Sequence, residues 1–282
     1  MTDFSSKASI NRGTTLCMSL SARPGNFGTR FQNHLYGALG LDYLYKSFTT
    51  TDLAAAIGGI RALGIRGCAI SMPFKEACIP LLDGLEPSAA AIESVNTIVN
   101  TDGVLRGYNT DYIAIERLIV QYDLPRDAPL LLRGSGGMGK AVACAFRDAG
   151  FRRGTLIARN GGVGRALADR CDWDWVARLE DLPRDAADGA ILVNVTPLGM
   201  SGGADAQTLA FPETMIARAG VVFDVVAIPV ETPLIRAARA VGRPAINGGE
   251  VLVLQGLEQF ALYTGVRPDA ALVREAAAVA LA

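Results

Sequence analysis

Histidine and paired cysteines, from which most protein metal sites are built, are scarce in this sequence. Among 282 residues there is one histidine, His34. We therefore expect no metal site and no Ser-His-Asp triad, which excludes most zinc hydrolases, and we place His34 partly buried on a helix over residues 31–39. The five cysteines have no C-x-x-C spacing and mostly apolar neighbours, which predicts buried, reduced thiols.

Runs of like charge and long apolar runs are also absent. Lys plus Arg total 27 against 28 for Asp plus Glu, with the signs interspersed, so the sequence favours a small-molecule partner over nucleic acid or an anionic membrane. No apolar stretch reaches the roughly 18 residues of a membrane span, and the first dozen residues lack the apolar core of a signal peptide. We expect a cytoplasmic protein with a flexible tail over residues 1–14.

What is present is an alternation of short apolar runs with helical patterns, which is typical of a parallel α/β sheet. The length of 282 residues, half of them hydrophobic, favours two domains. The predicted fold is therefore a two-domain α/β protein. We place one domain at residues 1–110, a second at 111–246, and C-terminal helices that pack back on the first domain at 247–282.

The expected elements follow the apolar pattern of the sequence. Strands are predicted at 16–20, 43–48, 66–71, 96–100, 104–108, 129–133, 155–158, 190–195 and 221–226. Helices are predicted at 28–39, 52–63, 112–120, 138–149, 164–170, 250–263 and 269–281. Asp102-Gly103 between two of the strands is a hairpin signal, so the first domain is expected to end with an antiparallel pair.

The most informative motif is the glycine-rich turn Gly134-Ser135-Gly136-Gly137-Met138-Gly139, which follows the apolar run Leu130-Leu131-Leu132 and opens a helix of small residues. This context is that of a dinucleotide-binding turn, so we predict that residues 111–246 form a Rossmann nicotinamide-dinucleotide domain. Glycines permit the tight turn, the close approach of a pyrophosphate and the packing of helix on sheet, and the helix N-terminus faces the anion. A glycine-rich surface turn without a ligand is the alternative.

The residues at the end of the next predicted strand indicate whether the cofactor is NAD or NADP. An NAD site places Asp or Glu there, on the ribose hydroxyls, whereas this chain has Ala158-Arg159-Asn160. A guanidinium pairs with a 2′-phosphate and a carboxylate repels it. The sequence therefore favours NADP over NAD, with Arg165 as either a second phosphate contact or a solvated helix charge.

Three polar segments stand at the ends of predicted strands in the first domain: Ser19-Leu20-Ser21, Ser71 to Lys75, and Asn109-Thr110-Asp111. Polar groups at the carboxyl ends of parallel strands project into the crevice where such sheets bind ligands. Hydroxyls, an amide, an ammonium and a carboxylate together suit a hydroxylated carboxylate, with Lys75 and Asp111 able to exchange a proton. The first domain is therefore the predicted substrate domain. For any one of these residues alone a structural role is favoured, because Ser and Asn commonly cap helices and Thr110-Asp111 can start the next helix.

These motifs resemble the shikimate dehydrogenases over about residues 16 to 265. The matching segments are Ser19-Leu20-Ser21, Pro73-Phe74-Lys75-Glu76, Ser94-Val95-Asn96-Thr97, Gly107 to Asp111, Gly134 to Gly137, Asn194 to Met200, Thr232-Pro233-Leu234, and Gly248-Gly249 through Gln255 and Phe260. The resemblance implies NADP-linked interconversion of shikimate and 3-dehydroshikimate, in the chorismate pathway of aromatic amino acid biosynthesis. It also implies a catalytic and a nicotinamide domain that close over a cleft.

The resemblance also implies roles for individual residues. Lys75 and Asp111 correspond to the catalytic pair, Ser19 and Ser21 hold the substrate carboxylate, and the other substrate contacts are Ser71, Asn96 and Gln255. The implied cofactor contacts are Gly134, Ser135, Gly136, Gly137, Met138, Arg159, Asn160, Thr196 and Gly248.

The sequence departs from the family pattern at four places. Residues 22–28 extend the serine motif before the next helix, Ser71 replaces the usual Thr, Ala69 an Asn, and Ala227 a tyrosine that touches the substrate. The two alanines remove hydrogen bonds of about 0.5 to 1.5 kcal/mol each, so turnover of shikimate is expected to be slow. One alternative is a dehydrogenase that acts on quinate or another cyclitol carboxylate. The other is a catalytically weak NADP-binding regulatory module. The sequence leaves open whether the protein is a monomer or a homodimer.

Overall fold

The computed structural model describes residues 10–281, and the chain divides into two compact units, 1–110 with 253–282, and 111–252. Residues 1–9 of the predicted tail lie outside the described residues. Residues 11–14 form a turn that is held to Asp42, which accepts hydrogen bonds from Asn11 Nδ2 at 3.2 Å and Thr14 Oγ1 at 2.7 Å. Asn11 and Thr14, which belong to the predicted tail, are therefore bound to the first unit.

The first unit is built on a six-stranded sheet with the order β2-β1-β3-β5-β6-β4. Its strands are β1 (Thr15–Leu20), β2 (Tyr43–Phe48), β3 (Gly67–Ile70), β4 (Gly84–Leu85), β5 (Thr97–Thr101) and β6 (Val104–Tyr108). The first three strands are parallel, and β5 runs antiparallel to both β3 and β6. The predicted hairpin is present: Asp102 (φ 51°) and Gly103 (φ 87°) form its two-residue turn, the left-handed pair that a type I′ turn requires.

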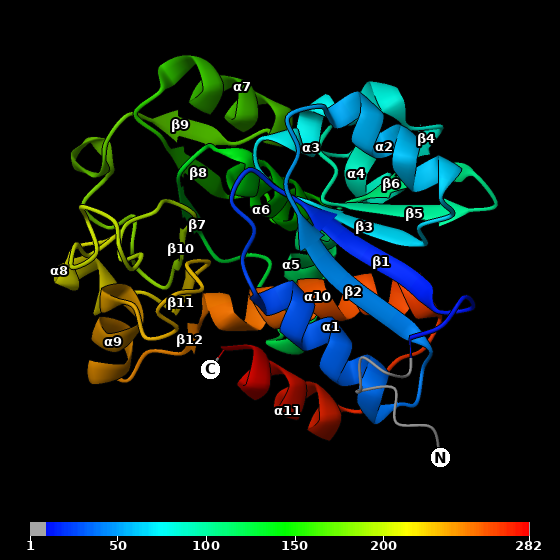
Figure 1. Cartoon of the computed structure of the whole chain (residues 1–282). Helices are drawn as coiled ribbons and strands as arrows, with labels where there is room; N and C mark the ends of the chain where they lie inside the picture. Colours follow the sequence, from blue (N-terminus) through cyan, green and yellow to red (C-terminus); the bar gives the residue numbers. More distant parts are fainter. Residues whose placement is uncertain (1–9, 282) are drawn as a thin grey trace. The chain divides into compact units, whose positions relative to one another are not determined.

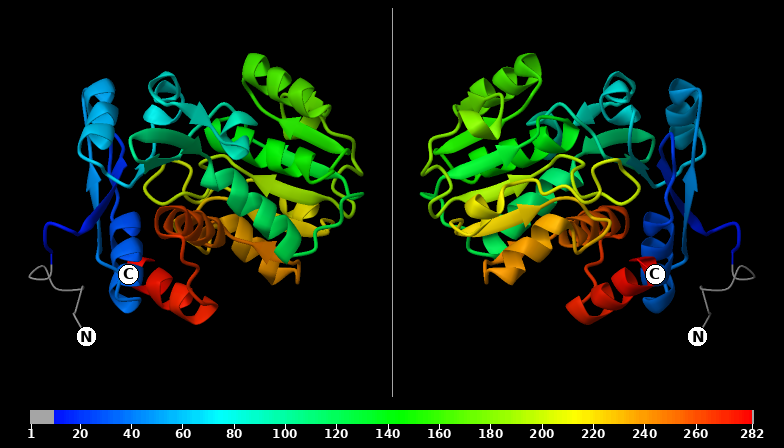
Figure 2. Two further views of the ribbon diagram at one scale, coloured as in Figure 1. Left: turned by 90° about the vertical axis from the view of Figure 1, so that its right-hand side faces the viewer. Right: turned by 90° about the vertical axis from the view of Figure 1, so that its left-hand side faces the viewer.

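Helices cover both faces of this sheet (Figures 1 and 2). They are α1 (Phe27–Ala38), α2 (Leu53–Ala62), the short α3 (Phe74–Ala77) and α4 (Pro87–Ala90), most of α10 (Gly248–Thr264), and α11 (Ala270–Leu281). One core packs α2 on Leu20, Cys68 and Ile98. The other packs α1, α10 and α11 on the opposite face, where Figure 2 shows α1 (blue) beside α11 (red).

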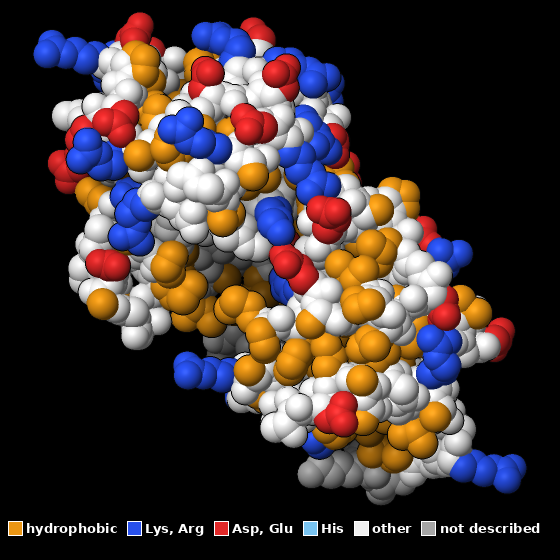
Figure 3. Space-filling model, turned by 90° about the horizontal axis from the view of Figure 1, so that it is seen from above, with side chains coloured by type: hydrophobic (Ala, Val, Ile, Leu, Met, Phe, Trp, Pro, Cys, Tyr) orange, Lys and Arg blue, Asp and Glu red, His pale blue; other side chains and the backbone are white. Residues whose placement is uncertain are grey.

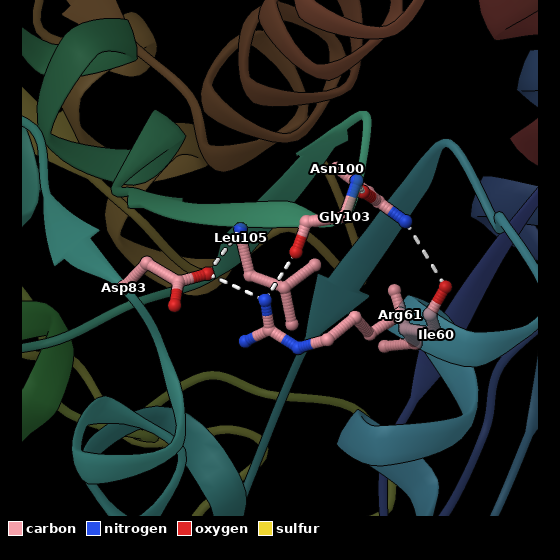
Figure 4. A network of polar contacts seen from close by, with 6 residues as sticks. All are labelled: Ile60, Arg61, Asp83, Asn100, Gly103 and Leu105. Atoms are coloured by element: carbon pink, nitrogen blue, oxygen red, sulfur yellow. Dashed lines mark hydrogen bonds and ion pairs between the residues drawn. The ribbon is translucent and has the colours of Figure 1, made fainter.

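A polar network joins helix α2 to the β5–β6 hairpin and to Asp83 of the same unit (Figure 4). Asp52 caps the helix by accepting a hydrogen bond from Ala55 N at 2.9 Å. At the other end, Arg61 Nη1 donates to Asp83 Oδ2 at 2.8 Å and to the Gly103 carbonyl, while Asp83 Oδ2 also accepts from Leu105 N at 2.7 Å. The helix therefore holds the β5–β6 hairpin in place.

The second unit is an all-parallel sheet with the order β12-β11-β10-β7-β8-β9. Its strands are β7 (Leu130–Arg133), β8 (Gly154–Ile157), β9 (Asp174–Val176), β10 (Ile191–Asn194), β11 (Val221–Asp224) and β12 (Ala245–Ile246). Counted from β7, this is the 3-2-1-4-5-6 order of the dinucleotide-binding fold, with its switch point between β7 and β10. The predicted α/β class and Rossmann domain are confirmed.

The helices of the second unit connect these parallel strands. They are α5 (Thr110–Gln121), α6 (Gly137–Asp148), α7 (Gly161–Cys171), α8 (Glu213–Ile216) and α9 (Pro233–Ala240). Asn160 caps α7 by accepting from Val163 N at 3.2 Å, and Thr232 caps α9 by accepting from Ile235 N at 3.2 Å. Pro233 then occupies the first helical position, where its missing N–H costs nothing.

The buried thiols and the histidine lie where the sequence placed them. All five cysteines are free and buried. His34 is half-buried on α1, with Nε2 3.1 Å from Glu275 Oε1 of α11. None of the helices in the described range 10–281 is long and apolar enough to cross a membrane.

Candidate active site

A cleft of about 610 Å³ opens at the carboxyl ends of four strands of the second unit. The turn after β7 contributes Gly134 to Gly136, and the segment after β8 contributes Ala158 to Asn160. Ala177 to Glu180 follow β9, and Val195 to Leu198 follow β10. This is the switch point of the sheet, where open α/β folds bind ligands. Six of the predicted cofactor contacts thus line one cleft: Gly134, Ser135, Gly136, Arg159, Asn160 and Thr196.

The glycines of the turn serve two different purposes. Gly134 has φ +116°, and a Cβ there would lie 2.8 Å from Val195 Cγ2. A Cβ on Gly139 would lie 2.8 Å from the Gly134 carbonyl oxygen. Both glycines are therefore required by the packing of the protein itself. At Gly136 and Gly137 a Cβ would meet nothing within 4 Å, so no described protein contact explains those two glycines.

The start of α6 is suited to an anion. Its N-cap is Gly136, which offers no side chain to the first N–H groups, and its first turn carries no acidic residue. Unpaired N–H groups at a helix N-terminus, together with the helix dipole, attract phosphate. A pyrophosphate at this turn accounts for the two open glycines. The residues present therefore fit a dinucleotide. Met138 stands in the first turn, half-buried.

Arg159 and Arg165 differ in what surrounds them. Arg159 is exposed, lines the cleft, and has no ion-pair partner in the described part of the chain. Arg165 instead lies over the Trp175 ring, 4.2 Å from guanidinium carbon to ring centroid. A cation in that position is stabilised by the ring. The structure therefore favours the interpretation of Arg165 as a helix charge over its interpretation as a second phosphate contact.

A buried network behind Thr196 fixes the turn after β10. Thr196 N and Oγ1 donate to Asn194 Oδ1 at 3.0 and 2.6 Å, and Asn194 Nδ2 donates to Asp224 Oδ1 at 2.9 Å. Thr232 Oγ1 donates to Asp224 Oδ2 at 2.6 Å. Burial raises the pKa of Asp224, with the three hydrogen bonds opposing the effect. Asn194 belongs to a segment that matches the family but is not among the predicted cofactor contacts, and Asp224 is missing from the predicted site. Both residues end apolar strands.

Gly248 does not line the cleft at Gly134. It is buried, and a Cβ there would lie 2.3 Å from the Val226 carbonyl carbon and oxygen and 2.5 Å from the Val225 oxygen. The close packing of α10 against this backbone explains the glycine without any cofactor. Its predicted cofactor contact therefore stays a prediction.

In the first unit, backbone bonds gather the predicted substrate residues of β1 and β3. Ser19 lies within β1, and its hydroxyl is a hydrogen-bond partner of the buried Tyr45. Ser21 N donates to the Phe48 carbonyl at 3.2 Å, and Ser71 N donates to the Leu20 carbonyl at 2.9 Å. The parallel strands β1 and β3 thus end side by side, with Ser21 and Ser71 directly after them.

Lys75 lies half-buried on the short helix α3. Its carbonyl accepts a hydrogen bond from Val95 N at 2.8 Å, which anchors α3 to the segment that carries Asn96. Asp111 is the second residue of α5 and the first residue of the second unit. The two members of the predicted catalytic pair therefore belong to different compact units.

Asn96 and Gln255 belong to one polar network of the first unit. Asn96 Oδ1 accepts from Thr110 N at 2.7 Å, from Thr97 Oγ1 at 2.9 Å and from Thr110 Oγ1 at 3.1 Å. Thr110 Oγ1 lies 3.5 Å from Gln255 Oε1, and Gln259 Nε2 donates to Thr97 Oγ1 at 3.1 Å. Asn96 Nδ2 makes no hydrogen bond to a described residue and is available to a ligand.

The sheet register places Ala69 in the middle of this site. Ser19 pairs with Ala69 across β1 and β3, and Ala69 pairs with Thr97 across β3 and β5. These three residues form one row across the sheet, and Ala69 contributes no polar atom from its side chain to that row. Ala227 lies in the second unit, half-buried in the segment after β11.

Metal ligands and charged patches also bear on the predicted partners. The described residues contain no group of three or more His, Cys, Asp or Glu side chains that could hold a metal ion. On the face shown in Figure 3, Lys and Arg side chains lie among Asp and Glu side chains, and no single sign gathers there.

Comparison with known proteins agrees with this arrangement. The model of the shikimate dehydrogenase substrate-binding domain matches residues 27–98, and that of the shikimate 5′-dehydrogenase C-terminal domain matches residues 248–278. A "shikimate dehydrogenase-like protein" of Haemophilus influenzae is 56% identical over 271 residues, which cover 96% of this chain and 98% of that protein.

Two solved structures show the same fold. Shikimate 5-dehydrogenase of Thermus thermophilus, in complex with NADP(H) and shikimate, has a TM-score of 0.83 and 30% identity, covering 94% of this chain and 99% of the other. Quinate dehydrogenase of Corynebacterium glutamicum, in complex with NAD, has a TM-score of 0.86 and 26% identity, covering 95% and 99%. These relatives are nicotinamide-nucleotide dehydrogenases that act on a CH–OH group, the enzyme class that the sequence predicted. The chain belongs to the shikimate dehydrogenase family.

Proposed function

We propose that this protein is an NADP-dependent oxidoreductase that interconverts a ring hydroxyl and a ketone on a small hydroxylated cyclic carboxylate, with shikimate and 3-dehydroshikimate as the first pair to test. The observation that carries the proposal is the Asn96 network, which holds Asn96 and Gln255 together through Thr110, the residue before Asp111. An otherwise buried amide, Asn96, keeps its donor nitrogen for a ligand.

When bound, NADP supplies the hydride that passes between nicotinamide C4 and the ring carbon. In the direction of reduction, the Lys75 ammonium donates a proton to the oxygen as the carbonyl becomes a hydroxyl, and Asp111 is the other member of the proposed catalytic pair. In the direction of oxidation Lys75, as the neutral amine, accepts the hydroxyl proton. Ser19, Ser21 and Ser71 orient the carboxylate, and Asn96 and Gln255 bind the ring hydroxyls.

The second unit supplies the cofactor site in this proposal. The first-turn N–H groups of α6 face the pyrophosphate, and the open backbone at Gly136 and Gly137 allows its close approach. Arg159 pairs with the adenosine 2′-phosphate. The Asp224 network orients Thr196 beside the cofactor. The absence of a carboxylate after β8 favours NADP over NAD.

A dehydrogenase assay tests the proposal. We would incubate the protein with shikimate or quinate, and with NADP or NAD, while measuring absorbance at 340 nm. Lys75→Ala is expected to lower kcat by about 10² to 10⁴-fold, the contribution of a positioned proton donor, with NADP affinity unchanged in calorimetry. Lys46→Ala is the matched control, because Lys46 is exposed on β2.

The outcomes separate the candidate functions. Equal rates for wild type and Lys75→Ala would refute the catalytic assignment. A higher kcat/KM on quinate would identify another cyclitol carboxylate as the substrate class. Binding of NADP without turnover of any cyclitol acid would support the regulatory module instead.

A further inference from the structure

The cofactor cleft contains a second exposed guanidinium that the sequence motifs do not identify. Arg178 lines the same cleft as Arg159, and its side chain is 71% exposed. It lies two residues beyond the end of β9, which is the edge strand of the sheet. Arg159 lies two residues beyond the end of β8. The two arginines therefore leave neighbouring strands at the same level.

The strand register supports this placement. Ile157, the last residue of β8, pairs with Val176, the last residue of β9, and Ala158 N donates to the Val176 carbonyl at 3.1 Å. Neighbouring strands lie about 4.8 Å apart. From backbones at that spacing, two arginine side chains have the reach to contact one phosphate. A third guanidinium, Arg133, is close enough for the charge of Arg159 to lower its pKa, although burial is the larger cause.

We propose that Arg178 and Arg159 together bind the adenosine 2′-phosphate, and that Arg178 is thus a second determinant of NADP specificity. This rests on the proposed NADP site. Arg165, the other candidate, lies over the Trp175 ring and is not among the residues that line the cleft. The N-terminal turn of α7 offers only Gly161, Gly162 and Val163 between Asn160 and Gly164, so it carries no basic side chain near its start.

Arg178 is free enough to turn toward a ligand. Its closest carboxylate is Asp181, with Nη2 3.5 Å from Oδ1, and both side chains are solvent-exposed. An exposed ion pair of this kind contributes little stability. A phosphate with two negative charges accepts a forked pair of hydrogen bonds from a guanidinium and is the stronger partner. Glu180 and Asp205 also line the cleft, against the three arginines.

Calorimetry with nucleotide fragments tests the inference without any turnover. We would titrate 2′,5′-ADP and 5′-AMP, which differ only in the 2′-phosphate, into wild type, Arg178→Ala, Arg159→Ala and the double variant. We expect Arg178→Ala to weaken binding of 2′,5′-ADP by about tenfold or more, as for a lost hydrogen bond to a charged group. The affinity for 5′-AMP should stay within about twofold. Arg178→Lys should bind 2′,5′-ADP with an affinity between those of wild type and Arg178→Ala, because lysine keeps the charge and loses the forked pair of donors.

Arg126→Ala is the matched control, because Arg126 is exposed and precedes β7, at the opposite end of the strand from the cleft. An equal loss of both nucleotides in Arg178→Ala would overturn the assignment and indicate contact with adenine or ribose. Unchanged affinity for 2′,5′-ADP would also overturn it, while a preference of wild type for 2′,5′-ADP would leave the NADP proposal standing. Failure of wild type to bind either nucleotide would overturn both proposals.

Discussion

Replacing Gly136 by alanine tests the glycine-rich turn most directly. Gly136 has φ −72° and ψ −171°, an extended conformation that any residue adopts, and a Cβ there would meet nothing within 4 Å. Alanine caps a helix less well than glycine but restricts the unfolded chain, and these opposing effects keep the change in stability within about 1 kcal/mol. The added methyl group projects instead into the space assigned to the pyrophosphate. A steric clash of about 1 to 3 kcal/mol there weakens NADP binding by roughly 5 to 150-fold.

Gly134→Ala provides the contrast within the same turn. Gly134 has φ +116°, and its Cβ would lie 2.8 Å from Val195 Cγ2 and 3.0 Å from Thr196 Cγ2. Backbone strain of about 1 to 3 kcal/mol adds to overpacking of a similar size, so the total cost is about 2 to 6 kcal/mol. At roughly 2 to 4 °C per kcal/mol, Tm should fall by about 5 to 20 °C.

Thermal unfolding and NADP calorimetry on the two variants separate these effects. We expect Gly136→Ala to keep the Tm of wild type and lose cofactor affinity, and Gly134→Ala to lose Tm. If Gly136→Ala binds NADP as tightly as wild type, the pyrophosphate does not approach this backbone, and the explanation given for the open glycine is wrong.

Three further predictions concern charged groups. Burial raises the pKa of Asp224 above 3.8. The contribution of Asp224 to stability is therefore fully present below about pH 3.8 and is lost as the pH rises through the raised pKa. Urea titrations should show wild type losing stability relative to Asp224→Asn over this range, with Asp169→Asn as an exposed control. The hydrogen bond from Arg61 lowers the pKa of Asp83 below 3.8. Wild type should therefore lose stability relative to Asp83→Asn as the pH falls through the range below 3.8. Because the pair is exposed, 1 M salt should reduce this difference in stability. Arg267 donates hydrogen bonds of 3.0 and 2.8 Å to the buried Glu258. Arg267→Ala should lower the free energy of unfolding by about 2 to 3 kcal/mol, which is less than the loss expected for a fully buried pair. A loss no larger than that of Arg274→Ala would contradict this prediction.

Local signals in the sequence were sufficient for much of the second unit. The apolar run before Gly134 and the small residues after Gly139 predict a strand, a turn and a helix, and the structure has β7 and α6 there. Asp102-Gly103 predicts the hairpin for a similar reason, because few residue pairs accept two left-handed conformations in succession. In both cases residues that are adjacent in the sequence determine the backbone conformation.

The missed elements depend on distant contacts. Strand β9 has only three residues, Asp174 to Val176, and Trp173 and Trp175 flank its polar start. It is a strand because Thr155, Leu156 and Ile157 of β8 pair with it. Short β4 and β12 are likewise defined by their neighbours in the sheet. Without β9, sequence reasoning had no reason to place Arg178 at a strand end beside Arg159.

The candidate site shows the same division between local and distant information. The motifs predict which residue types are present, but the fold decides which polar groups are already satisfied by protein. Thr97 accepts a hydrogen bond from Gln259 of α10 and donates to Asn96. Because of these two bonds, an alanine at position 69 leaves no buried hydroxyl of Thr97 without a partner. The replacement of an amide by Ala69 therefore costs the folded protein little, and its effect falls on whatever ligand group meets the row between Ser19 and Thr97.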